Sequence, residues 1–216
     1  MNVLVAGTGT EVGKTWVTAA VAIRLQRRGI AVRAHKPVQS FAPEQDRTDA
    51  HVLADATDVS PDAVCASHRW YPVAMAPPMA AEILDRPPFT IADLVAELPA
   101  TDTGVVLIEA AGGVRSPLAS DGDTVTLADA CRPALVVLVA EPGLGTINAV
   151  RLSADALAGH PLVVCLNRFD ADVDLHERNR RWLVTRGGLE VVTDPEALTL
   201  RISRCEGRSP GSDLSR

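Results

Sequence analysis

Lysine is nearly absent from this chain of 216 residues. Lys14 and Lys36 are the only lysines among 21 basic side chains, and arginine supplies the rest. Arginine can replace lysine on a solvated face, but its larger planar head does not fit a site built around a compact ammonium. Both lysines are therefore candidates for phosphate chemistry, and the alternative for Lys36 is survival by chance.

Aromatic residues are scarce, and apolar runs of membrane-spanning length are missing. Only 3% of the residues are aromatic whereas 47% are hydrophobic, so the core must be built from Ala, Val, Leu and Ile. This composition suits parallel strands buried on both faces, and it favours an α/β protein. No charged segment precedes a long apolar one at the N-terminus. We therefore expect a cytoplasmic protein without a membrane partner.

Paired cysteines and an excess of positive charge are also missing. The four cysteines are widely spaced, with no Cys-x-x-Cys pair, which argues against a metal or redox motif and predicts reduced thiols. The net charge of −6 and the pI near 5.3 argue against a surface for polyanions. We therefore expect no nucleic acid partner.

The length suits one domain. We expect this domain to span residues 1–198, and residues 199–216, rich in Ser, Gly and Arg, to form a disordered tail. Apolar runs predict buried strands at 3–6, 30–34, 105–109, 133–140 and 162–166. Helical patterns lie between the strands, for example at 14–28, 50–56, 90–98 and 176–186.

Residues 7–15 read GTGTEVGKT and stand between the first predicted strand and the first predicted helix. This order is typical of a phosphate-binding loop, in which glycines turn backbone N–H groups inward and the helix adds its positive dipole end. Lys14 can reach the terminal phosphates, and Thr15 can hold Mg²⁺. The usual first glycine would stand at Thr8, so the loop is a variant; the alternative is an ordinary turn that carries two glycines.

The second lysine lies in the segment KPVQS, residues 36–40. Pro37 cannot continue a central strand, so Lys36 and Ser40 are expected at the carboxyl edge of the sheet, where such folds bind ligands. Lys36 could thus face the same phosphates as Lys14. Asp49 begins the next helix, either as an ordinary residue of its first turn or as a metal ligand.

Three later segments also carry candidate binding groups. Glu109 ends a buried strand near the phosphate loop, where a carboxylate can anchor Mg²⁺, and the glycine pair Gly112 and Gly113 follows it. The Pro-rich loop that contains Pro77 could cover a small ligand or merely cover the core. At the start of a later helix, either an anion site or an ordinary helix cap is expected from Gly145, Thr146 and Asn148. Asn167, after the last strong strand, could read a purine base.

Together, six motifs resemble dethiobiotin synthetase, a family of P-loop NTPase type. They read GTGTEVGKT at 7–15, KPVQS at 36–40, TDA at 48–50, MAPP at 75–78, EAAGG at 109–113 and LGTIN at 144–148, in matching order across about residues 1–170. The resemblance implies a mostly parallel sheet flanked by helices and a homodimer with substrate near the subunit interface. It also implies a cyclo-ligase of biotin biosynthesis that uses ATP, Mg²⁺ and CO₂ to convert 7,8-diaminononanoate into dethiobiotin.

The resemblance also implies roles for individual residues. In the nucleotide site, it matches Gly9, Glu11, Val12, Gly13, Lys14, Thr15 and Asn167, the last as the reader of adenine. The catalytic groups around the carbamate and γ-phosphate would be Thr10, Lys14, Lys36 and Ser40. The Mg²⁺ positions match Thr15, Asp49 and Glu109. The substrate would contact Lys36, Ser40, Pro77, Gly112 and Gly113, and its carboxylate would meet Leu144, Gly145, Thr146 and Asn148 of the neighbouring subunit.

The chain departs from the family pattern at three places. Phe41 follows Ser40 where the family usually has glycine, which predicts a reshaped loop or a narrower pocket. Ala110 replaces the glycine after Glu109, which matters if that position needs a positive φ. The region after Asn167 lacks the family's usual Pro-containing segment near the nucleotide.

Three other functions remain compatible with the motifs. Another ATP-dependent carboxyl-activating synthetase would explain the loop and Glu109 equally well, but the segments at 36–40 and 144–148 less well. A degenerate regulatory homologue is also compatible with the sequence, because of Phe41 and Ala110. An ATP-driven positioning or partitioning switch would usually carry a lysine at the position of Gly9.

Overall fold

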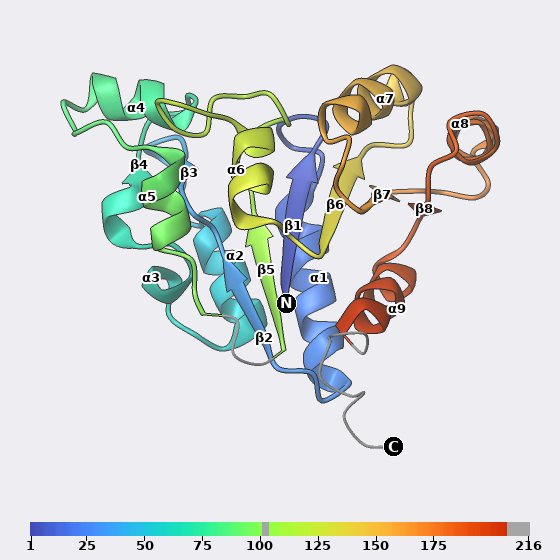
Figure 1. Ribbon diagram of the computed structural model, residues 1–216, viewed down its shortest axis with the longest axis horizontal. Helices are drawn as coiled ribbons and strands as arrows, with labels where there is room; N and C mark the ends of the chain where they lie inside the picture. Colours follow the sequence, from blue (N-terminus) through green and yellow to red (C-terminus); the bar gives the residue numbers. More distant parts are fainter. Residues whose placement is uncertain (101–103, 207–216) are drawn as a thin grey trace.

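A six-stranded parallel sheet forms the centre of the protein (Figure 1). The computed structural model describes residues 1–100 and 104–206. The strand order is β2-β5-β1-β6-β7-β8. The strands are β1 (Asn2–Gly7), β2 (Val32–His35), β5 (Val105–Glu109), β6 (Leu135–Ala140), β7 (Leu162–Leu166) and β8 (Val191–Val192). This arrangement confirms the predicted α/β fold.

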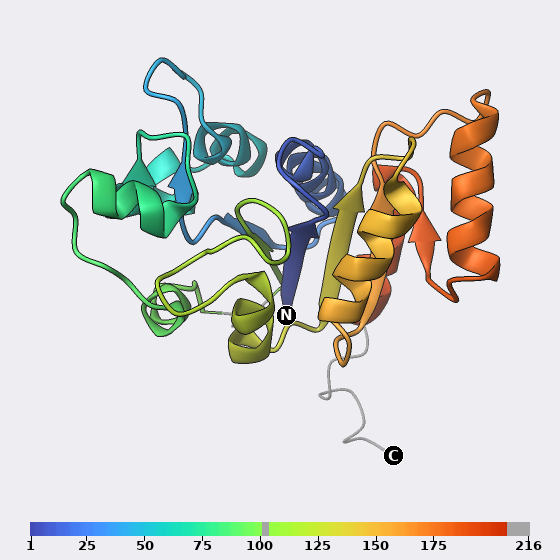
Figure 2. The same ribbon diagram turned by 90° about the horizontal axis from the view of Figure 1, so that it is seen from above.

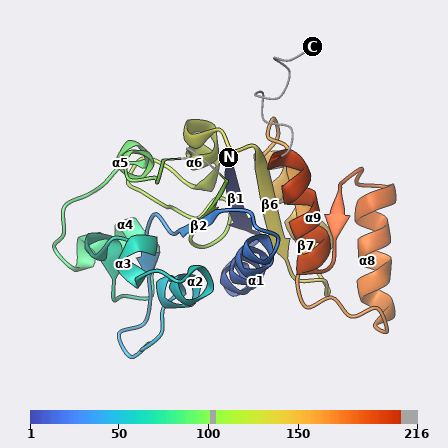
Figure 3. The ribbon, with the colours of Figure 1, turned by 90° about the horizontal axis from the view of Figure 1, so that it is seen from below.

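Helices cover both faces of this sheet, as the view from above shows (Figure 2). Seen from below, α1 and α2 lie on one side of the sheet and α5 and α6 on the other (Figure 3). The helices are α1 (Lys14–Arg27), α2 (Asp49–Thr57), α3 (Pro61–Val64), α4 (Pro77–Ile83), α5 (Ile91–Ala96), α6 (Thr124–Cys131), α7 (Thr146–Ala156), α8 (Asp174–Thr185) and α9 (Pro195–Glu206), with a 3₁₀ turn at Ser67–Arg69. In the part of the chain that is described, no helix has the length and apolarity to cross a bilayer.

The core lies on both faces because successive strand side chains point to opposite sides. On β1, Leu4 and Ala6 pack into the cluster under α4 to α8, whereas Val3 and Val5 pack into the cluster under α1 and α9. Strands β5 and β6 are buried along their whole length. Because both faces of these strands are buried, they consist mainly of continuous runs of aliphatic residues.

The prediction of a disordered tail is wrong for residues 199–206. These residues belong to α9, and residues 207–216 lie outside the described part of the chain. Leu198 and Ile202, one helical turn apart, are buried against the cluster that contains Val17 and Val21 of α1. Packing against α1 therefore stabilises a helix whose polar composition alone resembled disorder.

A small second sheet shapes the region beside the main one. Strands β3 (Gln39–Ser40) and β4 (Trp70–Tyr71) pair in parallel, with Gln39 opposite Trp70 and Ser40 opposite Tyr71. Strand β3 follows closely after β2, and α4 begins six residues after β4. The pair therefore holds the segment after β2 against the loop that leads into α4, and both segments line the site described below.

Candidate functional site

The phosphate loop connects β1 to α1 at the carboxyl edge of the sheet. Gly13 has a φ of 91° and Glu11 a φ of 61°, so both adopt the left-handed conformation. No side chain of the described residues caps the start of α1, and the first turn contains no acidic residue. The free N–H groups and positive dipole end of the helix are thus left for an anion.

Asn167 stabilises the phosphate loop through a hydrogen bond. Its side-chain amide nitrogen donates a hydrogen bond to the carbonyl of Val12 at 3.0 Å, and the residue is buried. A Cβ atom added at Gly13 would lie 2.0 Å from the same amide nitrogen. Glycine is therefore required at position 13 by close packing as well as by its φ. The predicted reading of adenine by Asn167 stays a prediction.

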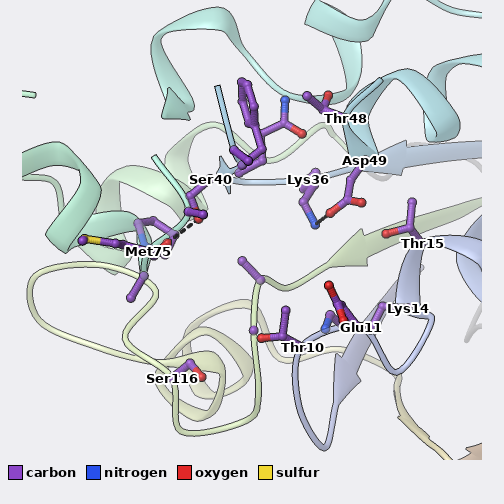
Figure 4. Close-up of a pocket in the computed structure, with 18 of the residues that line it drawn as sticks. Thr10, Glu11, Lys14, Thr15, Lys36, Ser40, Thr48, Asp49, Met75 and Ser116 are labelled. Carbon is purple, nitrogen blue, oxygen red and sulfur yellow. Dashed lines mark hydrogen bonds and ion pairs between the residues drawn. The ribbon is translucent and has the colours of Figure 1, made fainter. Parts of the chain in front are cut away.

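A cavity of about 820 Å³ opens between the phosphate loop and the segments that follow β2 and β4 (Figure 4). It brings together ten of the predicted site residues, namely Thr10, Glu11, Gly13, Lys14, Thr15, Lys36, Ser40, Asp49, Pro77 and Gly112. Strand β5 lies between β1 and β2 in the sheet, so its end reaches the cavity between the two lysine-bearing segments. The strand order thus explains why these distant motifs converge.

Lys14 is folded back over its own loop. Its ammonium donates to the carbonyl of Gly9 at 2.9 Å, and the residue is buried. Burial, together with the nearby charge of Lys36, lowers the pKa of Lys14 to about 8. A buried ammonium is poorly hydrated, and its contact with the neutral carbonyl of Gly9 does not balance its charge. Such a group binds an anion strongly.

Lys36 lies between two carboxylates. Its ammonium contacts Asp49 Oδ2 at 2.8 Å and Glu109 Oε1 at 2.7 Å, and only 2% of the side chain is exposed. Burial acts to lower the pKa of Lys36, but Glu109 and Asp49 outweigh it and raise the pKa above its usual value. Burial acts to raise the pKa of Asp49, but the ammonium of Lys36 outweighs it and lowers that pKa. Lys36 is therefore charged in this geometry.

The same oxygen atoms fit a Mg²⁺ ion. Thr15 donates its hydroxyl proton to Glu109 Oε1 at 2.8 Å, and Asp49 remains 43% exposed. Glu109 is fully buried, and its Oε2 has no hydrogen-bond partner among the described residues. Hard oxygen donors of this kind suit Mg²⁺, which would take its remaining ligands from phosphate and water. The predicted metal residues therefore converge, and Lys36 occupies the position between them.

The structure also shows the surroundings of Ser40, of the glycine pair and of Ala110. Ser40 donates its hydroxyl proton to the carbonyl of Met75 at 2.5 Å. Gly112 has a φ of 68°, and Gly113 approaches the phosphate loop so closely that an added Cβ would lie 3.4 Å from the Cα of Gly9. Ala110 is buried without a positive φ, so glycine is not required there.

The segment at the start of α7 does not line this cavity. Leu144 is 95% exposed, Gly145 has a φ of 92°, and Asn148 is exposed as well. Thr146 is buried, and its hydroxyl has no hydrogen-bond partner among the described residues. The predicted contact of this segment with a neighbouring subunit's substrate stays a prediction.

The cavity is also lined by Gln39, Phe41, Met75 and Arg168. The sequence relates Phe41 to the shape of the pocket and places Met75 in the motif at 75–78, but it assigns no role to Gln39 or Arg168. Gln39 stands inside the motif at 36–40, so its buried side chain, which accepts the Ala50 N–H at 3.1 Å, could have been included. Arg168 has a φ of 57°, but nothing in the local sequence marks it apart from its place after Asn167.

Comparison with solved structures supports the fold. The septum site-determining protein MinD of Pyrococcus horikoshii, solved with Mg-ADP, gives a TM-score of 0.50 at 17% identity over 97% of this chain and 90% of that one. The cell division protein FtsY of Thermotoga maritima gives 0.50 at 15% identity over 92% and 67% of the two chains. At such identities the likeness shows the fold alone, a mostly parallel sheet flanked by helices.

Comparison with sequences is more specific. A family model described as an AAA domain matches residues 1–196. The ATP-dependent dethiobiotin synthetase of Haloferax mediterranei is 35% identical over 88% of this chain and 82% of its own length. That of Corynebacterium efficiens is 38% identical over 72% of this chain and 70% of its own length. The chain therefore belongs to the dethiobiotin synthetase family.

Proposed function

We propose that this protein is an ATP-dependent ligase that converts 7,8-diaminononanoate and CO₂ into dethiobiotin. The observation that carries the proposal is the convergence of Lys14, Lys36 and Ser40 on one cavity beside the phosphate loop. The names of the relatives and the six motifs support the same substrate. Residues 1–198 would supply the ATP-binding and synthetase machinery of this reaction.

The reaction requires positioning and charge neutralisation rather than a protein nucleophile. One amine of the substrate attacks CO₂ and loses a proton, which gives a carbamate. A carbamate oxygen takes the γ-phosphoryl group of ATP with release of ADP, and the second amine then closes the ring and expels phosphate. In this scheme Lys14 holds the β- and γ-phosphates, and Lys36, Thr10 and Ser40 surround the transferring group.

The proposal includes Mg²⁺ held by Thr15, Asp49 and Glu109, which supplies charge neutralisation of the phosphates when bound. It also includes a homodimer in the cytoplasm, in which Leu144 to Asn148 of one subunit face the substrate carboxylate of the other. Glu109 contributes a fixed, buried negative charge to this arrangement. Thr15 keeps that carboxylate oriented through its 2.8 Å hydrogen bond.

The direct test is product formation. Purified protein is incubated with 7,8-diaminononanoate, ATP, Mg²⁺ and either ordinary or ¹³C-labelled bicarbonate, and the products are analysed by mass spectrometry. We expect dethiobiotin, one unit heavier with the labelled carbon, and one ADP per product molecule. Hydrolysis of ATP without dethiobiotin would favour another synthetase or a switch, and the absence of both would favour a regulatory homologue.

We expect triphosphate binding to weaken as the pH rises through about 8. The ammonium form of Lys14 attracts phosphate, and its pKa of about 8 means that the free protein loses this charge above that pH. Bound phosphate raises that pKa again, so the protein takes up a proton on binding and affinity falls by up to about tenfold per pH unit. Calorimetric titration at pH 7, 8 and 9 in buffers of different ionisation enthalpy measures both the affinity and the number of protons taken up on binding.

Lys14→Arg is the matched control, because arginine stays charged throughout this range. Its affinity is expected to be lower but independent of pH, and an equally flat wild-type profile would contradict the prediction. The lowered pKa of Lys14 affects folding stability in the opposite direction, because stability increases rather than decreases with pH. The unfolded chain keeps the Lys14 proton up to about pH 10.5, so between about 8 and 10.5 this group's contribution to the free energy of unfolding rises with pH.

A further inference from the structure

The cavity has two halves of different chemistry. The half at the phosphate loop is lined by polar and charged groups, among them Lys14 and Lys36. The other half is lined by the mainly apolar residues Phe41, Ala42, Ala74, Met75, Ala76 and Pro77. Figure 4 shows Ser40 and Met75 across the cavity from the phosphate loop. A ligand with a reacting polar end and a hydrocarbon chain matches this division.

Phe41 is held firmly in the apolar half. Its backbone N–H donates to the carbonyl of Tyr71 at 3.1 Å, which extends the pairing of β3 with β4. Its ring meets the ring of Trp70 edge to face, with centroids 6.1 Å apart. Trp70 is itself fixed, because its indole N–H donates to the carbonyl of Cys65 at 2.7 Å. The Phe41 side chain is thus positioned by the strand pairing and by its contact with Trp70.

The other apolar segment of the cavity, residues 74–77, is joined to β3. The hydroxyl of Ser40, the residue before Phe41, donates to the carbonyl of Met75 at 2.5 Å. This bond joins the segment 74–77 to β3, so the apolar residues of both segments line the same part of the cavity. An apolar lining of this kind can discriminate between ligands by the length of hydrocarbon chain that it covers.

We propose that Phe41 is a specificity-determining residue that forms the wall for the methylene chain of the diamine substrate. This inference rests on the proposed function and identifies the part of the substrate that the apolar half binds. Phe41 directly follows Ser40 and lines the same cavity. The methylene chain of a diamine whose two nitrogens lie in the polar half would therefore extend along Phe41. The contact exists in both the ground state and the transition state, so it acts on KM rather than on kcat.

The test combines a change in the protein with a change in the substrate. KM and kcat are measured for wild type and Phe41→Ala with 7,8-diaminononanoate and with 5,6-diaminoheptanoate, which has two fewer methylene groups. In wild type the shorter diamine has the higher KM. In Phe41→Ala we expect the KM ratio of short to long diamine to fall by about 5- to 15-fold, as loss of a contact with up to two methylenes predicts, with kcat nearly unchanged.

Two further variants complete the design. Phe41→Leu keeps apolar bulk and should retain most of the discrimination. Val59→Ala removes a 47% exposed apolar side chain that is not among the cavity-lining residues, so it should leave both KM values unchanged. An unaltered KM ratio in Phe41→Ala, with nucleotide affinity also intact, overturns the inference. Absence of any wild-type turnover of either diamine overturns the proposed function instead.

Discussion

Replacing Lys14 by alanine is expected to reduce affinity for the nucleoside triphosphate by at least about 100-fold and to nearly abolish turnover. The Lys14 ammonium is buried, and the only hydrogen bond that it makes to the described residues is to the carbonyl of Gly9. Its charge-assisted bonds to two phosphates are worth about 1.5–3 kcal/mol each. Because Lys14 holds the phosphates in the ground state and also neutralises the charge that develops on them in the transition state, Kd should rise and kcat should fall.

Isothermal titration with a non-hydrolysable triphosphate measures the affinity. Arg27→Ala serves as the matched control, because it removes one positive charge from the exposed last turn of the same helix, α1. That variant should bind like the wild type. Unchanged triphosphate affinity in Lys14→Ala would remove the basis for the phosphate site and with it the proposed ligase.

Replacing Lys36 by alanine should have two separable effects. The loss of a cation that neutralises charge in the transition state is expected to cost about 2.7–4 kcal/mol in the barrier, by analogy with loss of one preorganised donor. The free energy of unfolding should also fall by about 3–5 kcal/mol, because Glu109 is left buried without its counterion. Lys36→Arg should not rescue turnover, because the larger planar head cannot take the place of an ammonium between Asp49 and Glu109.

Chemical denaturation and the rate of dethiobiotin formation measure the two effects independently. The double variant Lys36→Met with Glu109→Gln removes both buried charges, so most of the lost stability should return while turnover stays low. A single variant that binds nucleotide and closes the ring at near the wild-type rate would show that Lys36 has no part in the chemistry. Equal stability of the single and double variants would show that the ion pair is energetically unimportant.

The sequence allowed the site's members to be predicted but not their pairings. Lys14, Lys36 and Glu109 each follow an apolar run, so their place at the carboxyl ends of parallel strands could be inferred from local patterns. The direct contact of Lys36 with Glu109 depends on strand order, because β5 lies beside β2 only in the folded sheet. Strand order is set by tertiary packing, which a single sequence does not display.

The elements that could not be predicted from the sequence are all stabilised by contacts between distant parts of the chain. Strands β3 and β4 are two residues long, too short to produce an alternating pattern, and they exist because each satisfies the other's backbone groups. Helix α9 has a polar composition, and its apolar residues Leu198 and Ile202 stabilise it only by packing against α1. Likewise, the hydrogen bond of Asn167 to Val12 could not be predicted, because it arises from the approach of β7 to the phosphate loop.

The packing of α9 against α1 also bears on how the chain folds during its synthesis. Helix α1 carries the phosphate loop at its start, while Arg24 and Arg28 near its other end form ion pairs with Glu196. Leu198 and Ile202 complete the cluster that covers this face of β1 and β6. Until residues 198 and 202 have been synthesised, this cluster lacks two of its apolar side chains, and the residues that they cover stay open to water. A growing chain therefore exposes part of this apolar face until near the end of α9, and chaperones can bind such a surface.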